Sequence, residues 1–313
     1  LRACITHIEA LLQQVANNFA LRADEHRHTL MVGRTHSQHA LPIAFGLKIA
    51  GWIAPLIRHQ ERLTELKERL LVVQFGGAVG TLASLGHDGL AVSDALAEEL
   101  ELGVPPMAWH TQRDTLVEFA GWLSLVTGSL GKMAQDIILM AQSEVAEIRE
   151  SDDPARGGSS TMPQKSNPII SELIVTIART NASLLSAMHQ AMIQEHERAT
   201  GSWQMEWLSL PQMVNLTAVA LAKALFIGQN MVVDVERMNA NVKASNGLMM
   251  AEAISLALAP KMGRGHAKTV VKTAVEIAIQ QNRHLVDVLK EQSDIDLDWD
   301  SYRDESHYLG MTD

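Results

Sequence analysis

The chain has 313 residues, of which 47% are hydrophobic and 20% are charged, so it can bury a substantial core and its composition does not favour disorder. Its net charge of −10 argues against a nucleic acid partner, because binding phosphates requires a basic surface. A small anionic substrate is compatible with that charge, since a few converging cations make a positive pocket on an acidic protein.

The single cysteine, Cys4, excludes an intrachain disulfide framework and favours a reducing, cytoplasmic compartment. Apolar runs are interrupted well before the roughly 20 residues that a membrane span needs, so we expect no membrane partner. The chain opens with LRACITHIEALLQQ, which is typical of the middle of an amphipathic helix rather than of a signal peptide. We therefore expect further residues to precede it.

The first polar cluster is MVGRTHSQHALP, residues 31–42. Its imidazoles titrate near neutrality and suit a proton donor or a group that orients substrate. His36 and His39 have the spacing of a metal-binding pair, but two histidines without a carboxylate partner are too few, so no metal is expected. A capped helix start with surface histidines remains the alternative interpretation.

The rest of the chain is predicted to be helical. Residues 63–73 carry apolar side chains at helical spacing, and the same spacing runs through 115–149, enough for a helix of roughly 50 Å. Proline, which costs about 3 kcal/mol inside a helix, is absent from three long intervals, and no alternating strand pattern is evident. These intervals are residues 107–153, 169–210 and 212–259. The sequence thus predicts an all-α protein with a central bundle of long helices.

Two polar segments flank the predicted helices. WHTQRD (109–114) offers Gln112 and Arg113 as donors to a carboxylate, although an ion pair at a helix start explains these residues equally simply. EHERATGSWQMEW (195–207) places Arg198 beside two tryptophans, which are usually core residues. Beyond a boundary near 239–250, shorter helices predict a small C-terminal domain at 236–313, after a bundle domain at 1–235.

Residues 150–168, ESDDPARGGSSTMPQKSNP, form a loop by composition. Two glycines precede two serines, and Lys165 and Asn167 follow before Pro168 opens the next helix. A serine acts as a base only where its alkoxide is stabilised, and backbone amides with a lysine supply that environment. Amides at the helix start would favour an anion. An ordinary flexible linker has the same composition.

These segments together resemble the fumarase/aspartase (fumarate lyase) superfamily. Residues 158–168, GSSTMPQKSNP, are similar to its motif GSSxMPxKxNP at every fixed position. GRTHSQHALP resembles its second region, and GGAVGT with QRD resembles the branch that contains adenylosuccinate lyases. The resemblance covers nearly the whole chain. It implies a homotetramer with active sites shared between subunits, a small polycarboxylate substrate and no cofactor.

The same resemblance implies roles for individual residues. Ser159 is expected to be the base that removes a proton alpha to a carboxylate, with His36 as acid or orienter. Lys165 and Asn167 are expected to hold carboxylate oxygens as negative charge develops. The remaining substrate-binding candidates are Gln112, Arg34, Thr35 and Arg198.

Within the superfamily, residues 44–52, 109–136 and 201–211 resemble the branch that lactonises carboxylated muconates. Trp207 stands where adenylosuccinate lyases have an arginine, which weighs against a nucleotide-linked substrate. The resemblance therefore implies interconversion of 3-carboxy-cis,cis-muconate and 4-carboxymuconolactone. The alternatives are adenylosuccinate lyase or another lyase of substituted succinates, and a structural member of the superfamily that has lost catalysis.

Overall fold

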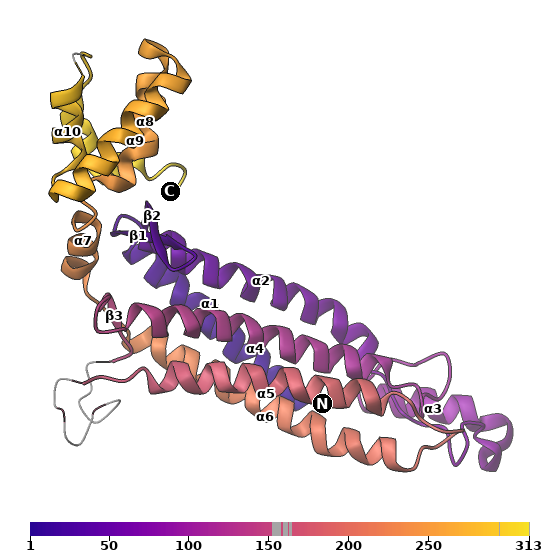
Figure 1. Ribbon diagram of the computed structural model, residues 1–313. Helices are drawn as coiled ribbons and strands as arrows, with labels where there is room; N and C mark the ends of the chain where they lie inside the picture. Colours follow the sequence, from indigo (N-terminus) through magenta and orange to yellow (C-terminus); the bar gives the residue numbers. More distant parts are fainter. Residues whose placement is uncertain (152–157, 159–161, 163–164, 294, 313) are drawn as a thin grey trace. The chain divides into compact units, whose positions relative to one another are not determined.

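A computed structural model describes residues 1–151, 158, 162, 165–293 and 295–312 (Figure 1). The chain divides into two compact units, which we call the bundle unit and the hairpin unit. The bundle unit contains residues 1–19, 51–139 and 149–232, and the hairpin unit contains residues 20–50, 140–148 and 233–313. The predicted domain boundary at 235/236 stays a prediction, because compactness alone does not show that either part folds independently.

Long helices build the bundle unit (Figure 1). Along α4, apolar side chains at three- and four-residue steps are fully or nearly fully buried, including Phe119, Leu123, Val126 and Leu130. α5 and α6 pack against each other, and α3 is a shorter helix. The bounds are α1 (Arg2–Glu25), α2 (Phe45–Leu70), α3 (Gly89–Glu99), α4 (Asp114–Met140), α5 (Ile169–Ala191) and α6 (Gly201–Asn230), of which α1 and α2 continue into the hairpin unit. The predicted all-α bundle is confirmed.

Two helix boundaries differ from the sequence prediction. α6 runs through Pro211, which was expected to separate two helices, because packing along a helix of 30 residues outweighs one missing hydrogen bond. α4 ends at Met140 rather than near residue 149. After it the chain turns, with Ala146 at a left-handed φ of 52° and the Glu147 amide donating to the Met140 carbonyl.

By length and composition, α5 and α6 could each cross a membrane. In this structure both belong to the bundle core, where Ile174 and Ile177 of α5 and Leu221 of α6 are buried. The buried Asn181 amide donates to the Thr217 hydroxyl at 3.0 Å, which joins the two helices by a polar contact. Packing within this chain thus accounts for part of their apolar composition, since 28% of the apolar window of α5 and 39% of that of α6 is buried.

The hairpin unit contains a short antiparallel hairpin, which the sequence did not predict. β1 (Leu30–Thr35) pairs with β2 (Gln38–Ala44), with an irregularity between Val32 and Arg34. The strands are short and the turn is His-Ser rather than the Asn-Gly that marks such hairpins, so the usual signal was absent. The interpretation of this segment as a capped helix start was therefore wrong.

The other helices of the hairpin unit have their own core, which includes Ile254, Leu258, Val271 and Leu285. Val32 of β1 packs with Val242 of α7 in a smaller cluster. The helices are α7 (Val235–Lys243), α8 (Ala251–Met262), α9 (Arg264–Gln281) and α10 (Leu285–Gln292), and the two-residue strands β3 (Ile148–Arg149) and β4 (Val232–Val233) lie where the chain passes between units.

A buried histidine in α2 makes the stability of the bundle unit depend on pH. His59 is 3% exposed, and its Nε2 lies 2.9 Å from the Ser129 hydroxyl. Burial, and then the charges of Arg62 and Arg58, lower the pKa of His59 to about 4. The native protein therefore holds this imidazole neutral at pH values where the unfolded chain protonates it.

Between pH 6.5 and 4, we expect this one group to remove up to about 3 kcal/mol of the free energy of unfolding. The stabilisation is complete above pH 6.5 and falls as the pH falls, because only the unfolded state takes up the proton. Urea titrations at pH 7 and pH 4.5 should show a smaller loss in His59→Gln than in the wild type. His7→Gln, at an exposed position of α1, is the control, and an equal loss in all three proteins would contradict the prediction.

Candidate active site

The first group of predicted residues lies just before α5, at one end of the bundle unit. Lys165 is exposed and Asn167 is half-buried. Ser166, which lies between Lys165 and Asn167 in the sequence, forms an antiparallel bridge with Gly158. This bridge brings the beginning of the motif at 158–168 next to a residue near its end. Ser159, the predicted base, lies outside the described residues.

The backbone amides at the start of α5 bind a carboxylate of the chain itself. The Ile170 and Ser171 amides donate to the two carboxylate oxygens of Glu150 at 3.0 and 2.5 Å. Glu150 is 7% exposed, and a carboxylate is stabilised at a helix N-terminus. The anion that these amides were expected to favour is therefore an internal carboxylate, which accepts from two of them and fixes the end of the segment that carries Lys165 and Asn167.

The second group lies where α4 begins and α6 begins. A cavity of about 660 Å³ is lined by Trp109, His110, Arg198 and Trp203, together with residues 74–78. Arg198 donates to the Ala78 and Gly77 carbonyls at 2.9 and 2.8 Å, and its Nη2 is 3.4 Å from Nε2 of His110. Burial, and then the neighbouring arginines, lower the pKa of His110. The cavity thus combines a cation, an imidazole and aromatic walls.

A buried ion pair lies at the wall of this cavity. Arg113 donates to Glu206 of α6 through two nitrogens at 2.8 and 2.6 Å, and both side chains are 8% exposed. The Arg113 guanidinium also lies over the Trp109 ring, 5.1 Å from its centroid. Arg113 is therefore bound to α6 and does not form the local ion pair at the helix start that the sequence suggested. Gln112, one residue earlier, is exposed and 3.8 Å from the Met107 sulfur.

The two groups lie at opposite ends of the bundle unit. α5 has 23 residues and separates Asn167 from Arg198, and α4 has 27 residues and separates Gln112 from Glu150. At 1.5 Å per residue these helices span about 34 and 40 Å. Within one chain, Lys165 and Asn167 therefore cannot contact the substrate that Gln112 and Arg198 contact.

The third group occupies the hairpin of the hairpin unit. Thr35 and His36 are exposed at the turn, where His36 and Ser37 have φ values of 48° and 62°. Arg34 is half-buried and donates to both carboxylate oxygens of Glu147 at 2.9 and 2.7 Å. The structure thus groups the predicted residues 34–36 on one turn, with the guanidinium of Arg34 already paired.

Several residues around these groups were not found from the sequence. Glu206, Glu147 and His110 have long-range partners that no local pattern reveals. Glu206 could have been found, because it is a lone acid between two tryptophans in an apolar segment. A buried carboxylate needs a partner, so this position predicts an ion pair with another segment. Trp207, which was expected to be buried, is 57% exposed. The centroid of its ring lies 4.9 Å from that of the Trp203 ring.

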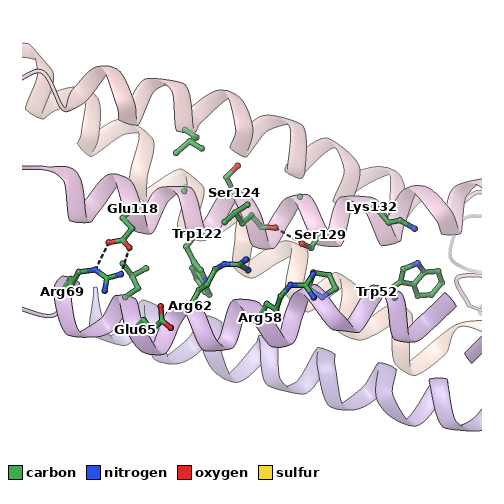
Figure 2. Close-up of a pocket in the computed structure, with 17 residues that line it drawn as sticks. Trp52, Arg58, Arg62, Glu65, Arg69, Glu118, Trp122, Ser124, Ser129 and Lys132 are labelled. Atoms are coloured by element: carbon green, nitrogen blue, oxygen red, sulfur yellow. Dashed lines mark hydrogen bonds and ion pairs between the residues drawn. The ribbon is translucent and has the colours of Figure 1, made fainter. Parts of the chain in front are cut away.

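A second cavity, of about 800 Å³, runs along the face between α2 and α4 (Figure 2). None of the described site residues lines it. Its charged walls include Arg58, Arg62 and the ion pair of Arg69 with Glu118. Gly121 and Gly128 leave open space on this face, because a Cβ atom at either would meet no other atom within 4 Å. The groove is therefore open along α4.

Comparison with known proteins identifies the family. A family model described as lyase matches residues 1–181, and one described as adenylosuccinate lyase C-terminus matches residues 247–313. A 3-carboxy-cis,cis-muconate cycloisomerase of Pseudomonas aeruginosa is 45% identical over 99% of this chain and 69% of its own length. The chain belongs to the fumarate lyase superfamily. The resemblance stated from its motifs is thereby confirmed.

Solved structures of this superfamily share the fold. The 3-carboxy-cis,cis-muconate lactonizing enzyme from Pseudomonas putida has a TM-score of 0.95 and 44% identity, over 100% of this chain and 71% of that one. A fumarate lyase from Mesorhizobium has a TM-score of 0.92 and 39% identity, over 99% and 71%. The chain spans about seven tenths of the length of these relatives.

Proposed function

We propose that this chain is part of a cycloisomerase that interconverts 3-carboxy-cis,cis-muconate and 4-carboxymuconolactone. The observation that carries this proposal is the 45% identity to a cycloisomerase of that name over nearly the whole chain. The intact motif at 158–168 supports catalysis, since a structural relative has no need for the serine, lysine and asparagine together.

In the proposed mechanism, the lactone opens when Ser159 removes the proton alpha to the side-chain carboxylate. The electron pair passes through the aci-carboxylate, the ring C–O bond breaks, and the ring oxygen leaves as a carboxylate. Lys165 and Asn167 stabilise the charge that builds on the aci-carboxylate oxygens. In the reverse direction the substrate's carboxylate adds to the double bond and Ser159 returns the proton, while His36 orients the substrate or acts as an acid.

The cavity at the start of α6 supports a small polycarboxylate rather than a nucleotide-linked substrate. Arg198 contributes one positive charge, while the charge of Arg113 is balanced by Glu206. Trp207, whose ring contacts the lining residue Trp203, stands where an adenylosuccinate lyase has a cation. In the proposed complex Gln112 and Arg198 contact one end of the substrate, and Thr35 contacts it beside His36.

We also propose that the protein is a soluble, cytoplasmic homotetramer with active sites shared between subunits. The separation of Asn167 from Arg198 by the length of α5 supports this, because one substrate can contact both only if they come from different copies. The open, glycine-lined groove between α2 and α4 offers a face on which a helix of another copy can pack closely.

The assay that tests the function follows carboxymuconate spectrophotometrically with the full-length protein, with adenylosuccinate as the comparison substrate. Turnover of carboxymuconate alone supports the cycloisomerase. Turnover of adenylosuccinate alone would assign the chain to the succinate lyases. Absence of both activities in a folded tetramer would favour a structural protein.

A shared site predicts that inactive variants restore one another. Lys165→Ala and Gln112→Ala are each expected to be nearly inactive, because every site in either tetramer lacks one group. When the two variants are unfolded together and refolded, mixed tetramers should regain a measurable fraction of wild-type turnover, since some sites then take Lys165 from a Gln112→Ala chain and Gln112 from a Lys165→Ala chain. Refolding each variant alone is the control. Equal, negligible turnover in mixed and unmixed samples would contradict a shared site.

A further inference from the structure

The turn that carries His36 has an unfavourable backbone conformation for its residues. His36 and Ser37 both have positive φ, at 48° and 62°, in the two-residue turn closed by Thr35 and Gln38. Such turns favour asparagine and glycine, because other side chains crowd the backbone in this region. Strained positions of this kind persist only where the surrounding structure holds them. The contacts at the base of the turn therefore determine where His36 lies.

Arg34, two residues before His36, makes the strongest of these contacts. Its two terminal nitrogens donate to the two carboxylate oxygens of Glu147, whose side chain has no exposed surface. A bidentate arginine–carboxylate pair fixes the plane and direction of both groups. Burial makes this pair costly to break, since the remaining charge would be left without a partner.

Glu147 is in turn held from α7. The Asn241 side-chain amide donates to Glu147 Oε1 and to the Val145 carbonyl, both at 2.9 Å. Arg237 of the same helix donates to the Val145 carbonyl at 3.0 Å. The Asp234 amide, just before α7, donates to the Glu147 carbonyl at 2.9 Å. A chain of hydrogen bonds thus runs from α7 through Glu147 to Arg34 and the turn.

We propose that Arg34 is a positioning residue that acts on the reaction through His36, with Glu147 and Asn241 as its supports, and that it does not bind substrate. Its charge is balanced by Glu147, and both of its terminal nitrogens are already bonded to that carboxylate, so little remains to attract a second carboxylate. The inference rests on the proposed function only in giving His36 a part in the reaction, and it replaces the substrate-binding role expected for Arg34.

A double-mutant cycle in the full-length protein tests this role. Arg34→Gln is expected to lower kcat for carboxymuconate about 10²-fold while KM changes less than about threefold, because the substitution displaces His36 and removes no substrate contact. In a His36→Asn background, Arg34→Gln should cause no further loss, since its effect passes through His36. A tenfold rise in KM with kcat preserved, or equal losses in both backgrounds, would overturn the proposal.

A second pair of variants distinguishes the loss of this hydrogen-bond network from a general loss of stability. Glu147→Gln should reproduce the loss in kcat, whereas Glu144→Gln, an identical change at an exposed position on the same segment, should not. Asn241→Ala removes only one of the side chains that hold Glu147, and it replaces Glu147→Gln in this comparison if that variant does not fold. Equal kcat values for the variants at 144 and 147 in folded proteins would count against the inference.

Hydrogen exchange measured by mass spectrometry gives a readout that does not need activity. Glu147→Gln and Asn241→Ala should speed exchange in peptides covering residues 34–39, with no change in α8–α10. Unchanged exchange at 34–39 would overturn the positioning network even in an inactive protein. Failure of the wild type to turn over carboxymuconate, with the expected exchange pattern, would instead overturn the proposed function alone.

Discussion

Replacing Ser159 with alanine is expected to lower turnover of carboxymuconate by about 10³-fold or more and to leave the fold and the oligomeric state unchanged. The substitution removes one oxygen atom and with it the only group to which the proposed mechanism assigns the proton alpha to the carboxylate. Binding should change little, because carboxylate contacts come from other side chains. The measurement is kcat and KM for carboxymuconate, together with the mass of the assembly by light scattering.

Ser166→Ala is the matched control, because Ser166 belongs to the same motif and contacts Gly158 through a backbone bridge that the substitution leaves in place. It should keep turnover within about threefold of the wild type. If Ser159→Ala retained near-normal kcat, the base would have to be another group, and the proposed serine mechanism would be wrong.

The second large effect is expected at the ion pair between Arg113 and Glu206. Arg113→Met should lower the free energy of unfolding by about 3–5 kcal/mol, because it leaves the Glu206 carboxylate buried without its partner. Adding Glu206→Leu should recover most of that loss, since two apolar side chains of similar volume need no partner. Urea denaturation of the wild type, both single variants and the double variant measures the cycle.

The exposed pair of Arg69 with Glu118 is the matched control for this cycle. Its side chains are 50% and 45% exposed, so water screens the pair and Arg69→Met should cost far less stability than Arg113→Met. Similar losses at the two pairs would show that burial does not govern the energy of the pair at 113 and 206. A double variant less stable than both single variants would contradict the expected recovery.

The sequence by itself determined the class of the fold and the family. Apolar residues at three- and four-residue steps indicate helices whatever their partners are. The proline-free intervals correctly predicted long helices at α4 and α5, whereas the interval 212–259 contains the end of α6 and two shorter helices. The motif at 158–168 was equally informative, because its functional residues are neighbours in the chain. Local patterns of this kind depend only on backbone geometry and on residues a few positions apart.

Only the tertiary structure decided which charges are available to a substrate. Arg34 and Arg113 are candidates for binding a carboxylate in the sequence, and Glu150 has no evident role there, yet each has a partner that the fold brings from another segment. The hairpin at 30–44 escaped prediction because its positive-φ turn is imposed by surrounding contacts, not favoured by His-Ser. A long helix after Pro168 was predicted, but only the structure shows that it ends at Ala191 and that its whole length separates Asn167 from Arg198.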